Sequence, residues 1–151
     1  MEQIEIYTDG SWDWKSRTGG WAARIQQGAT TKVISGAAEN TTNNRMELQA
    51  VIEALQSLKT KCTIELFTDS MYVIRILQAK RSVFNKNGDL CRLVKQLALE
   101  HEVSAHWVKG HSGNEFNELV DTIAREEMRC MLDQLSCSNM DSDLSLNLDY
   151  F

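Results

Sequence analysis

Two short runs of nearly the same sequence dominate the hydrophobic pattern of this chain. Residues 4–9 read Ile-Glu-Ile-Tyr-Thr-Asp and residues 64–69 read Ile-Glu-Leu-Phe-Thr-Asp. Each run is rich in β-branched and aromatic residues, has the length of a strand and stops at an Asp followed by a small residue. We therefore expect two buried strands that deliver Asp9 and Asp69 to the C-terminal edge of a sheet, where ligands bind in open α/β folds.

The remaining pattern predicts the other elements of the fold. A polar loop is expected after Asp9, and the apolar residues that follow alternate as in strands or recur at helical spacing. The further predicted strands cover residues 20–27, 30–37 and 103–108, and the predicted helices open in residues 41–47 and cover residues 70–79, 90–101 and 117–132. This order predicts an α/β fold with a mixed five-stranded sheet, three antiparallel and then parallel strands, flanked by helices.

Length and composition indicate one soluble domain. The 151 residues contain no apolar run long enough to span a membrane, and the acidic start, Met1-Glu2-Gln3, is not that of a secretory signal. The cysteines lack a CxxC pair and an accompanying histidine pattern, so we interpret them as reduced thiols of a cytoplasmic protein rather than a disulfide or zinc site. They are Cys62, Cys91, Cys130 and Cys137.

The net charge of −5 is unevenly distributed along the chain. All 16 Lys and Arg lie at or before Arg129, together with 17 of the 21 acids, so the body carries −1. If four body carboxylates hold metal ions, the rest of the body carries +3. Mild acidity therefore does not exclude a phosphate-bearing partner, although it predicts weaker non-specific attraction than a basic protein would have.

Two further acids are expected at the edge that holds Asp9 and Asp69. Glu47 opens the first helix, where it fits either a capping box with Asn44 or a third carboxylate at the strand ends. Asp121 lies in the first turns of the last helix, where an acid is often present simply because it favours the helix dipole. The duplicated strand ending in Asp favours the site reading of Glu47, and Asp121 is favoured because it follows His111, in a loop with two glycines, at the same edge of the sheet.

Four carboxylates in one place could not all stay ionised without cations. Oxygen ligands without cysteine or clustered histidine select Mg²⁺ or Mn²⁺, and two such ions about 4 Å apart suit in-line attack on a phosphodiester. His111 stands between Gly110 and Gly113, which leave it free to move, and could transfer protons or help product and metal leave. His101 and His106 lack this setting, and we interpret them as ordinary histidines.

Five motifs in the same order resemble those of type I ribonuclease H over residues 1 to about 132. They are Tyr-Thr-Asp-Gly-Ser at 7–11, Thr-Thr-Asn-Asn-Arg-Met-Glu-Leu at 41–48, Thr-Asp-Ser at 68–70, Trp-Val-Lys-Gly-His-Ser-Gly at 107–113 and Asn-Glu-x-x-Asp at 117–121. The resemblance implies a ribonuclease H-like fold. It also implies endonucleolytic hydrolysis of the RNA strand of an RNA/DNA hybrid with two Mg²⁺ ions, or Mn²⁺ as a substitute, leaving 5′-phosphate and 3′-hydroxyl ends.

The same resemblance assigns roles to individual residues. Asp9, Glu47, Asp69 and Asp121 match the metal-binding acids of the family, and His111 matches its mobile histidine. The implied substrate contacts are Gly10, Ser11, Thr42, Asn43 and Asn44, with Met71 where the family often has Gln. Such contacts read sugars and groove shape, so little sequence preference is expected.

The chain departs from the family pattern in the regions that bind substrate. Residues 12–18 replace the usual Gly-Asn-Pro-Gly type stretch, and only residues 80–88 stand where many bacterial members carry a long basic protrusion. We expect weaker hybrid binding unless other residues or a partner compensate. The candidates are Trp12, Trp14, Lys15, Arg17, Lys80, Arg81 and Lys86.

The end of the chain lies outside the resemblance. We divide the chain into a catalytic domain, residues 1–132, and an acidic extension, residues 133–151. The extension is expected to be either disordered or a docking strand or peptide that binds a protein partner or a second copy through residues 141–151. Without such docking a monomer is expected.

The leading function is a hybrid nuclease, and two alternatives stay open. A weakly active hybrid-binding or replication-scaffold module would keep the fold and lose turnover. A DNA strand-transfer or exonuclease relative would share the acids, but would not be expected to carry the motifs around Asn43-Asn44 and His111.

Overall fold

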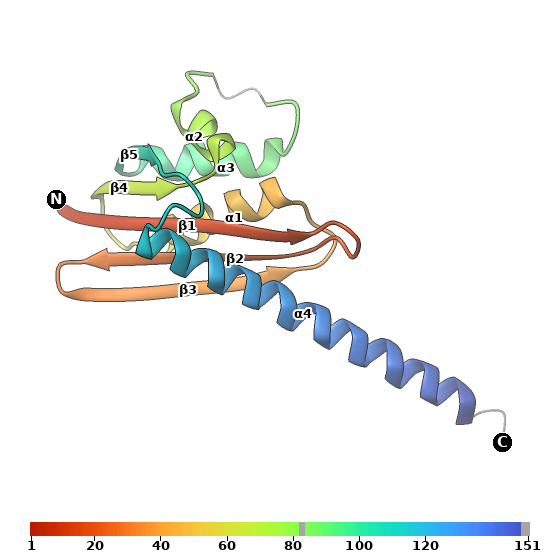
Figure 1. Ribbon diagram of the computed structural model, residues 1–151. Coiled ribbons are helices and arrows are strands. Elements are labelled where there is room, and N and C mark those ends of the chain that lie inside the picture. The colour runs from red at the N-terminus through yellow and green to blue at the C-terminus, as the bar shows by residue number, and fades with distance from the viewer. Residues whose placement is uncertain (82–83, 149–151) are drawn as a thin grey trace.

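The computed structural model describes the backbone of residues 1–81 and 84–148 and the side chains through Asn139, again without residues 82–83. The described residues form five strands and four helices in the predicted order (Figure 1). The strands are β1 (Glu2–Asp13), β2 (Thr18–Gln27), β3 (Thr30–Ala38), β4 (Cys62–Thr68) and β5 (Glu102–Trp107), and the helices are α1 (Asn43–Gln56), α2 (Met71–Gln78), α3 (Gly88–Leu99) and α4 (Glu115–Leu148).

The strands make one mixed sheet in the order β3-β2-β1-β4-β5. The strands β1, β2 and β3 pair antiparallel, whereas β4 lies parallel to β1 and β5 parallel to β4. The predicted fold class is confirmed.

The first strand is longer than predicted. The antiparallel pairing of β1 with β2 continues from Asp9 to Asp13, opposite Thr18, whereas its parallel pairing with β4 ends at Tyr7. The expected polar loop after Asp9 is therefore wrong, because most of residues 10–20 are strand and only residues 14–17 form the turn. Asp9 lies inside β1, just past the point where its parallel partner ends.

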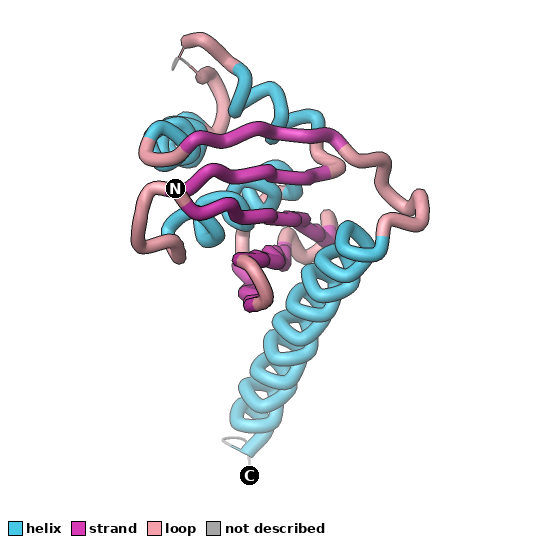
Figure 2. The backbone as a smooth tube through the Cα atoms, turned by 90° about the vertical axis from the view of Figure 1, so that its left-hand side faces the viewer, coloured by secondary structure: helices cyan, strands magenta, loops and turns pink. Residues whose placement is uncertain are grey.

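Helices cover both faces of the sheet. The main core packs α1, α2 and α3 against one face, around fully buried side chains such as Ile6, Leu48 and Leu66. The other face of β1 and β2 is covered by α4, through Tyr7, Val120 and Ala124. Figure 2 shows α4 on one side of the strands, running on past them.

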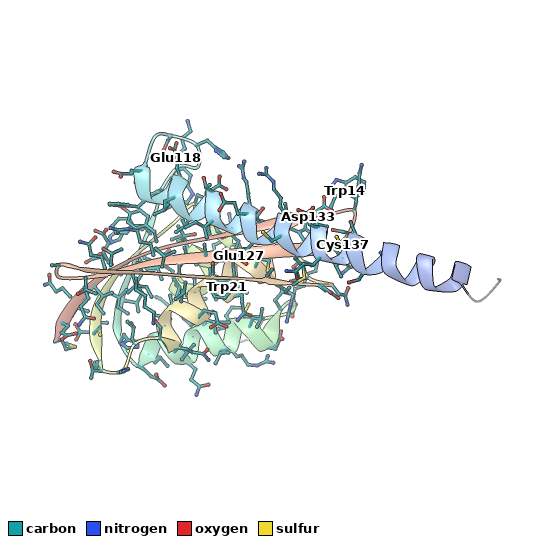
Figure 3. The ribbon with its side chains drawn as sticks, turned by 90° about the horizontal axis from the view of Figure 1, so that it is seen from below. Trp14, Trp21, Glu118, Glu127, Asp133 and Cys137 are labelled. Carbon is teal, nitrogen blue, oxygen red and sulfur yellow. The ribbon has the colours of Figure 1, made fainter. Side chains whose placement is uncertain are left out.

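The last helix is longer than predicted. Helix α4 does not end near residue 132 but continues to Leu148, so residues 133–148 are neither strand nor irregular. The sequence contains no proline and no glycine after Gly113, so nothing in it breaks the helix. The distal half of α4 projects from the body in Figures 1 and 3. The rest of the proposed docking segment, residues 149–151, lies outside the described residues.

Among the described residues, no helix is long and apolar enough to cross a membrane.

Because α4 packs closely on β2, we expect one methyl group added at Gly20 to lower the stability of the fold. A Cβ built at Gly20 would lie 2.1 Å from the carbonyl oxygen of Ala124 and 2.7 Å from the backbone nitrogen of Met128. We expect Gly20→Ala to push the helix outward and lower the free energy of unfolding by roughly 2–3 kcal/mol, measured by urea denaturation.

Gly88→Ala is the matched control for this substitution. At Gly88 the added Cβ would meet the guanidinium end of Arg92, which is flexible and can move away. The packing argument fails if both variants unfold at the same urea concentration.

Candidate active site

The two repeated sequences pair with each other. In the parallel ladder Ile4 lies opposite Ile64, and the register runs through to Tyr7 opposite Phe67, whose rings stack with their centroids 4.7 Å apart. The same register places Asp9 and Asp69 at equivalent points just past the last pair. The duplication thus brings two carboxylates side by side because the repeat pairs in phase.

The start of α1 adds Glu47 through a close backbone approach. A Cβ at Gly10 would lie 2.7 Å from the backbone nitrogen of Glu47, so only glycine lets the helix come this near to β1. The N-cap is Thr42, whose hydroxyl accepts a hydrogen bond from the backbone nitrogen of Arg45 at 3.2 Å. The capping-box reading of Glu47 with Asn44 is therefore wrong, and Glu47 lies one turn further in.

Asp9, Glu47 and Asp69 form one carboxylate cluster. One oxygen from each lies within 4.8 Å of the others, and Asp9 and Glu47 are only 3 % and 5 % exposed. Burial, followed by the charges of Glu47 and Asp69, raises the pKa of Asp9 far above its ordinary value. Burial and then the charge of Asp69 also raise the pKa of Glu47. The cluster therefore resists full ionisation at neutral pH.

The donor set fits a divalent cation that prefers oxygen ligands. The Oε2 atom of Glu47 is buried and has no hydrogen-bond partner, although a buried carboxylate oxygen is costly to leave unpaired. Three carboxylates without cysteine or histidine suit Mg²⁺ or Mn²⁺ better than zinc. A divalent ion at this point would pair the free oxygen and offset the repulsion that raises both pKa values.

Asp121 lies beside the cluster but outside its closest group. The Asp121 side chain, 21 % exposed, pairs with the Nη2 atom of Arg125 one turn along α4 at 3.0 Å. A side-chain hydrogen bond with Asp121 also contributes to the raised pKa of Asp9, so the two carboxyls are neighbours. The structure thus gathers all four predicted acids at one edge, three tightly and the fourth beside a cation.

The loop that carries His111 is held at both ends. The indole nitrogen of Trp107 donates to the backbone oxygen of Asp69 at 3.1 Å, and the backbone nitrogen of Gly113 donates to Glu118 at 3.1 Å. Between these anchors His111 is exposed and has a φ of 55°, in the left-handed region. Its Nε2 atom lies 3.4 Å from the Nη2 atom of Arg125, which can only donate, so this ring nitrogen is the acceptor.

The predicted substrate residues surround the carboxylates on three elements. Gly10 and Ser11 continue β1, and the hydroxyl of Ser11 lies 3.7 Å from the sulfur of Met128. Thr42 caps α1 and is half-buried, while Asn43 and Asn44 are exposed at its start. Met71 is exposed as the first residue of α2.

Two residues of the site were missed by sequence reasoning. Arg125 could have been found, because it stands four residues after Asp121 and so on the same helix face. Trp107 opens one of the five motifs, but the sequence did not predict its hydrogen bond to Asp69, which depends on the pairing of β4 with β5.

Comparisons with known proteins give the family. The family model described as RNase H matches residues 1–129. The chain belongs to the ribonuclease H family. Among similar proteins, the ribonuclease H of Oleidesulfovibrio alaskensis is 44 % identical over 83 % of this chain and 90 % of its own length. The ribonuclease H of Chlorobium phaeovibrioides is 41 % identical, over 85 % of this chain and 97 % of its own length.

Solved structures share the fold at low sequence identity. LC9-RNase H1, a type 1 RNase H with the type 2 active-site motif, is 23 % identical with a TM-score of 0.76, covering 85 % of this chain and 72 % of the other. The N-terminal RNase H domain of rv2228c from Mycobacterium tuberculosis is 19 % identical with a TM-score of 0.77, covering 89 % of this chain and 99 % of the other. Family and fold together support a nuclease of the ribonuclease H type that uses divalent metal.

The raised pKa values predict that the metal-free ribonuclease H domain gains stability when one acid is neutralised. Because the folded chain holds the Asp9 proton more tightly than the unfolded chain, stability falls as pH rises above the ordinary carboxyl pKa. We expect Asp9→Asn to raise the free energy of unfolding on the order of 2 kcal/mol at pH 8 with chelator, and by much less near pH 4.

Asp133→Asn is the matched control for charge, because Asp133 is an exposed acid of α4. Thermal and urea unfolding at both pH values check the prediction. A lower stability of Asp9→Asn than of the unmodified chain at pH 8 would contradict it.

Proposed function

We propose that the enzyme cleaves the RNA strand of RNA/DNA hybrids endonucleolytically, with two Mg²⁺ ions or Mn²⁺ in their place, and leaves 5′-phosphate and 3′-hydroxyl ends. The observation that carries the proposal is the cluster of Asp9, Glu47 and Asp69 with the unpaired Oε2 of Glu47, on a chain of the ribonuclease H family.

The proposed roles follow from where each side chain lies. Asp9, Glu47 and Asp69 would hold the ions on rigid elements, and Asp121 would complete the set from α4. When bound, the ions would supply an activated water and stabilise the charge that develops on the leaving oxygen. His111, exposed on its anchored loop, is placed to move a proton at Nε2 or to help the product leave.

We propose that the start of α1 recognises the hybrid. Asn43 and Asn44 are exposed there, at the start of the helix whose Met46 and Glu47 lie against the backbone of Gly10. Amides and backbone groups suit the minor groove, where 2′-hydroxyls mark the RNA strand. Thr42 would contact the DNA phosphate and Met71 would border the groove.

The turn of the β1–β2 hairpin is our candidate for the part of the chain that binds substrate in place of the missing basic protrusion. Trp14 is 68 % exposed at its tip, with the Lys15 ammonium 5.6 Å from its ring centroid. In Figure 3 the labelled Trp14 stands away from the strands at the end toward which α4 projects. An exposed tryptophan flanked by a lysine suits packing on a nucleic-acid strand.

The C-terminal part of α4 stays outside this function. The family match ends at residue 129, and we propose that residues 133–151 form an acidic extension separate from the catalytic domain of residues 1–132. A cytoplasmic location, a monomeric state, and a partner or second copy bound through residues 141–151 likewise stay proposals.

A cleavage assay tests the proposed activity. Labelled RNA/DNA hybrid, duplex DNA and single-stranded RNA are incubated with the enzyme in Mg²⁺, Mn²⁺ or chelator, alongside Asp69→Asn. We expect cleavage of the hybrid's RNA alone, abolished by chelator and lowered at least a thousandfold in Asp69→Asn, because the ions would lose a ligand from the cluster.

The outcomes of this assay separate the proposals. Cleavage that survives chelation or Asp69→Asn would sink the metal mechanism. Tight hybrid binding without cleavage would instead favour the weakly active scaffold. End-labelling of the products shows whether the 5′ ends carry phosphate.

A second assay tests the hairpin turn. We expect Trp14→Ala to raise the KM for hybrid several-fold and to leave kcat nearly unchanged, because the turn would hold substrate without touching the reacting phosphate. Leu99→Ala is the control, since Leu99 is 83 % exposed at the end of α3, away from the carboxylates. An equal KM in Trp14→Ala and the unmodified enzyme would remove the turn from substrate binding.

A further inference from the structure

One cation reaches the acidic site from within the chain. The Nη2 atom of Arg125 lies 3.0 Å from Oδ2 of Asp121 and 3.4 Å from Nε2 of His111. Among the ion pairs of the described residues, this is the pair that involves one of the four candidate metal-binding acids. Arg125 thus joins the fourth carboxylate to His111.

The two groups that Arg125 joins are more exposed than Asp9 and Glu47. Asp121 and Arg125 have side chains that are 21 % and 42 % exposed, and His111 is exposed, whereas Asp9 and Glu47 are buried in the tight cluster. A guanidinium that is partly in solvent can leave its partner at modest cost, because a half-exposed ion pair contributes little net free energy. The contact can therefore form and break without disturbing the core.

We propose that Arg125 is a positioning residue that competes with a metal ion for Asp121. In the metal-free enzyme the guanidinium supplies the positive charge beside Asp121 that the fourth carboxylate needs, and it ties His111 to the same place. An ion that takes Oδ2 of Asp121 as a ligand has to displace Arg125, and the displacement frees His111. This inference rests on the proposed function in one respect, because it takes the four acids to be metal ligands.

The competition has a specific signature in metal binding. The ion held by Asp9, Glu47 and Asp69 does not require Arg125 to move, whereas an ion that uses Asp121 does. Of two binding steps for Mn²⁺, only the one that involves Asp121 should depend on Arg125. Removing the guanidinium should tighten this step, and keeping a positive charge at the position should preserve most of the competition.

Isothermal titration with Mn²⁺ alone, supported by electron paramagnetic resonance of free Mn²⁺, tests the proposal on the full chain. We expect Arg125→Ala to tighten the Asp121-dependent step roughly three- to tenfold and to leave the other step unchanged. Arg125→Lys should bind Mn²⁺ nearly as the unmodified enzyme does. Arg129→Ala is the matched control, because Arg129 is exposed one turn further along α4.

A double-mutant cycle with Asp121→Asn assigns the effect. Arg125→Ala should have no influence on Mn²⁺ binding when Asp121 is already Asn. Unchanged or weaker binding in Arg125→Ala, a change that persists in the Asp121→Asn background, or the same change in Arg129→Ala would each overturn the proposal. The isotherms need no substrate, so failure to cleave hybrid would count against the proposed function and leave this result to be judged on its own.

Discussion

Repulsion among buried carboxylates is the cost that the rest of this structure has to offset. Asp9, Glu47 and Asp69 are held with oxygens within 4.8 Å, and two of them are almost completely buried. Such a cluster opposes folding of the metal-free chain, since burial and like charge raise the pKa of Asp9 and of Glu47. The surrounding packing has to offset this cost, and it does so from elements whose positions are fixed independently of the site.

Those elements are fixed by apolar contacts on both sides of the sheet. Strands β1 and β4 and helix α1 contribute to the larger core, and α4 closes the opposite face of β1 and β2. Gly10 and Gly20 then allow α1 and α4 to approach the strands more closely than any side chain would permit. The acids at positions 9 and 47 are therefore brought together by packing, and they meet in spite of their charge.

The fold class and the meeting of the four acids at one sheet edge could be predicted because both depend on patterns that are visible in the sequence. The repeated hexapeptide pairs with itself in register, so the similarity of residues 4–9 and 64–69 already contained the proximity of Asp9 and Asp69. The length of β1 escaped prediction because the end of a strand depends on each partner, and β2 continues where β4 stops. The end of α4 was misjudged because the prediction stopped where the family resemblance stopped, near residue 132, although no proline or glycine follows there to break the helix.

The longer β1 joins two parts of the proposed mechanism in one rigid piece. The strand that carries Asp9 continues through Gly10 and Ser11 to the turn that presents Trp14, and its ladder with β2 is unbroken to Asp13. The backbone nitrogen of Thr41 also donates to the carbonyl of Arg17 at 2.8 Å, which ties this turn to the approach of α1. The carboxylates, the Asn43-Asn44 start of α1 and the exposed tryptophan are thus held at set distances by backbone hydrogen bonds. Asp121 and His111 come instead from α4 and from the loop before it, and Arg125 bridges their partly exposed side chains. A site that has to hold a duplex and also admit and release ions is well served by this division, because the proposed substrate contacts lie on backbone-paired elements and the Arg125–Asp121 ion pair is partly exposed to solvent.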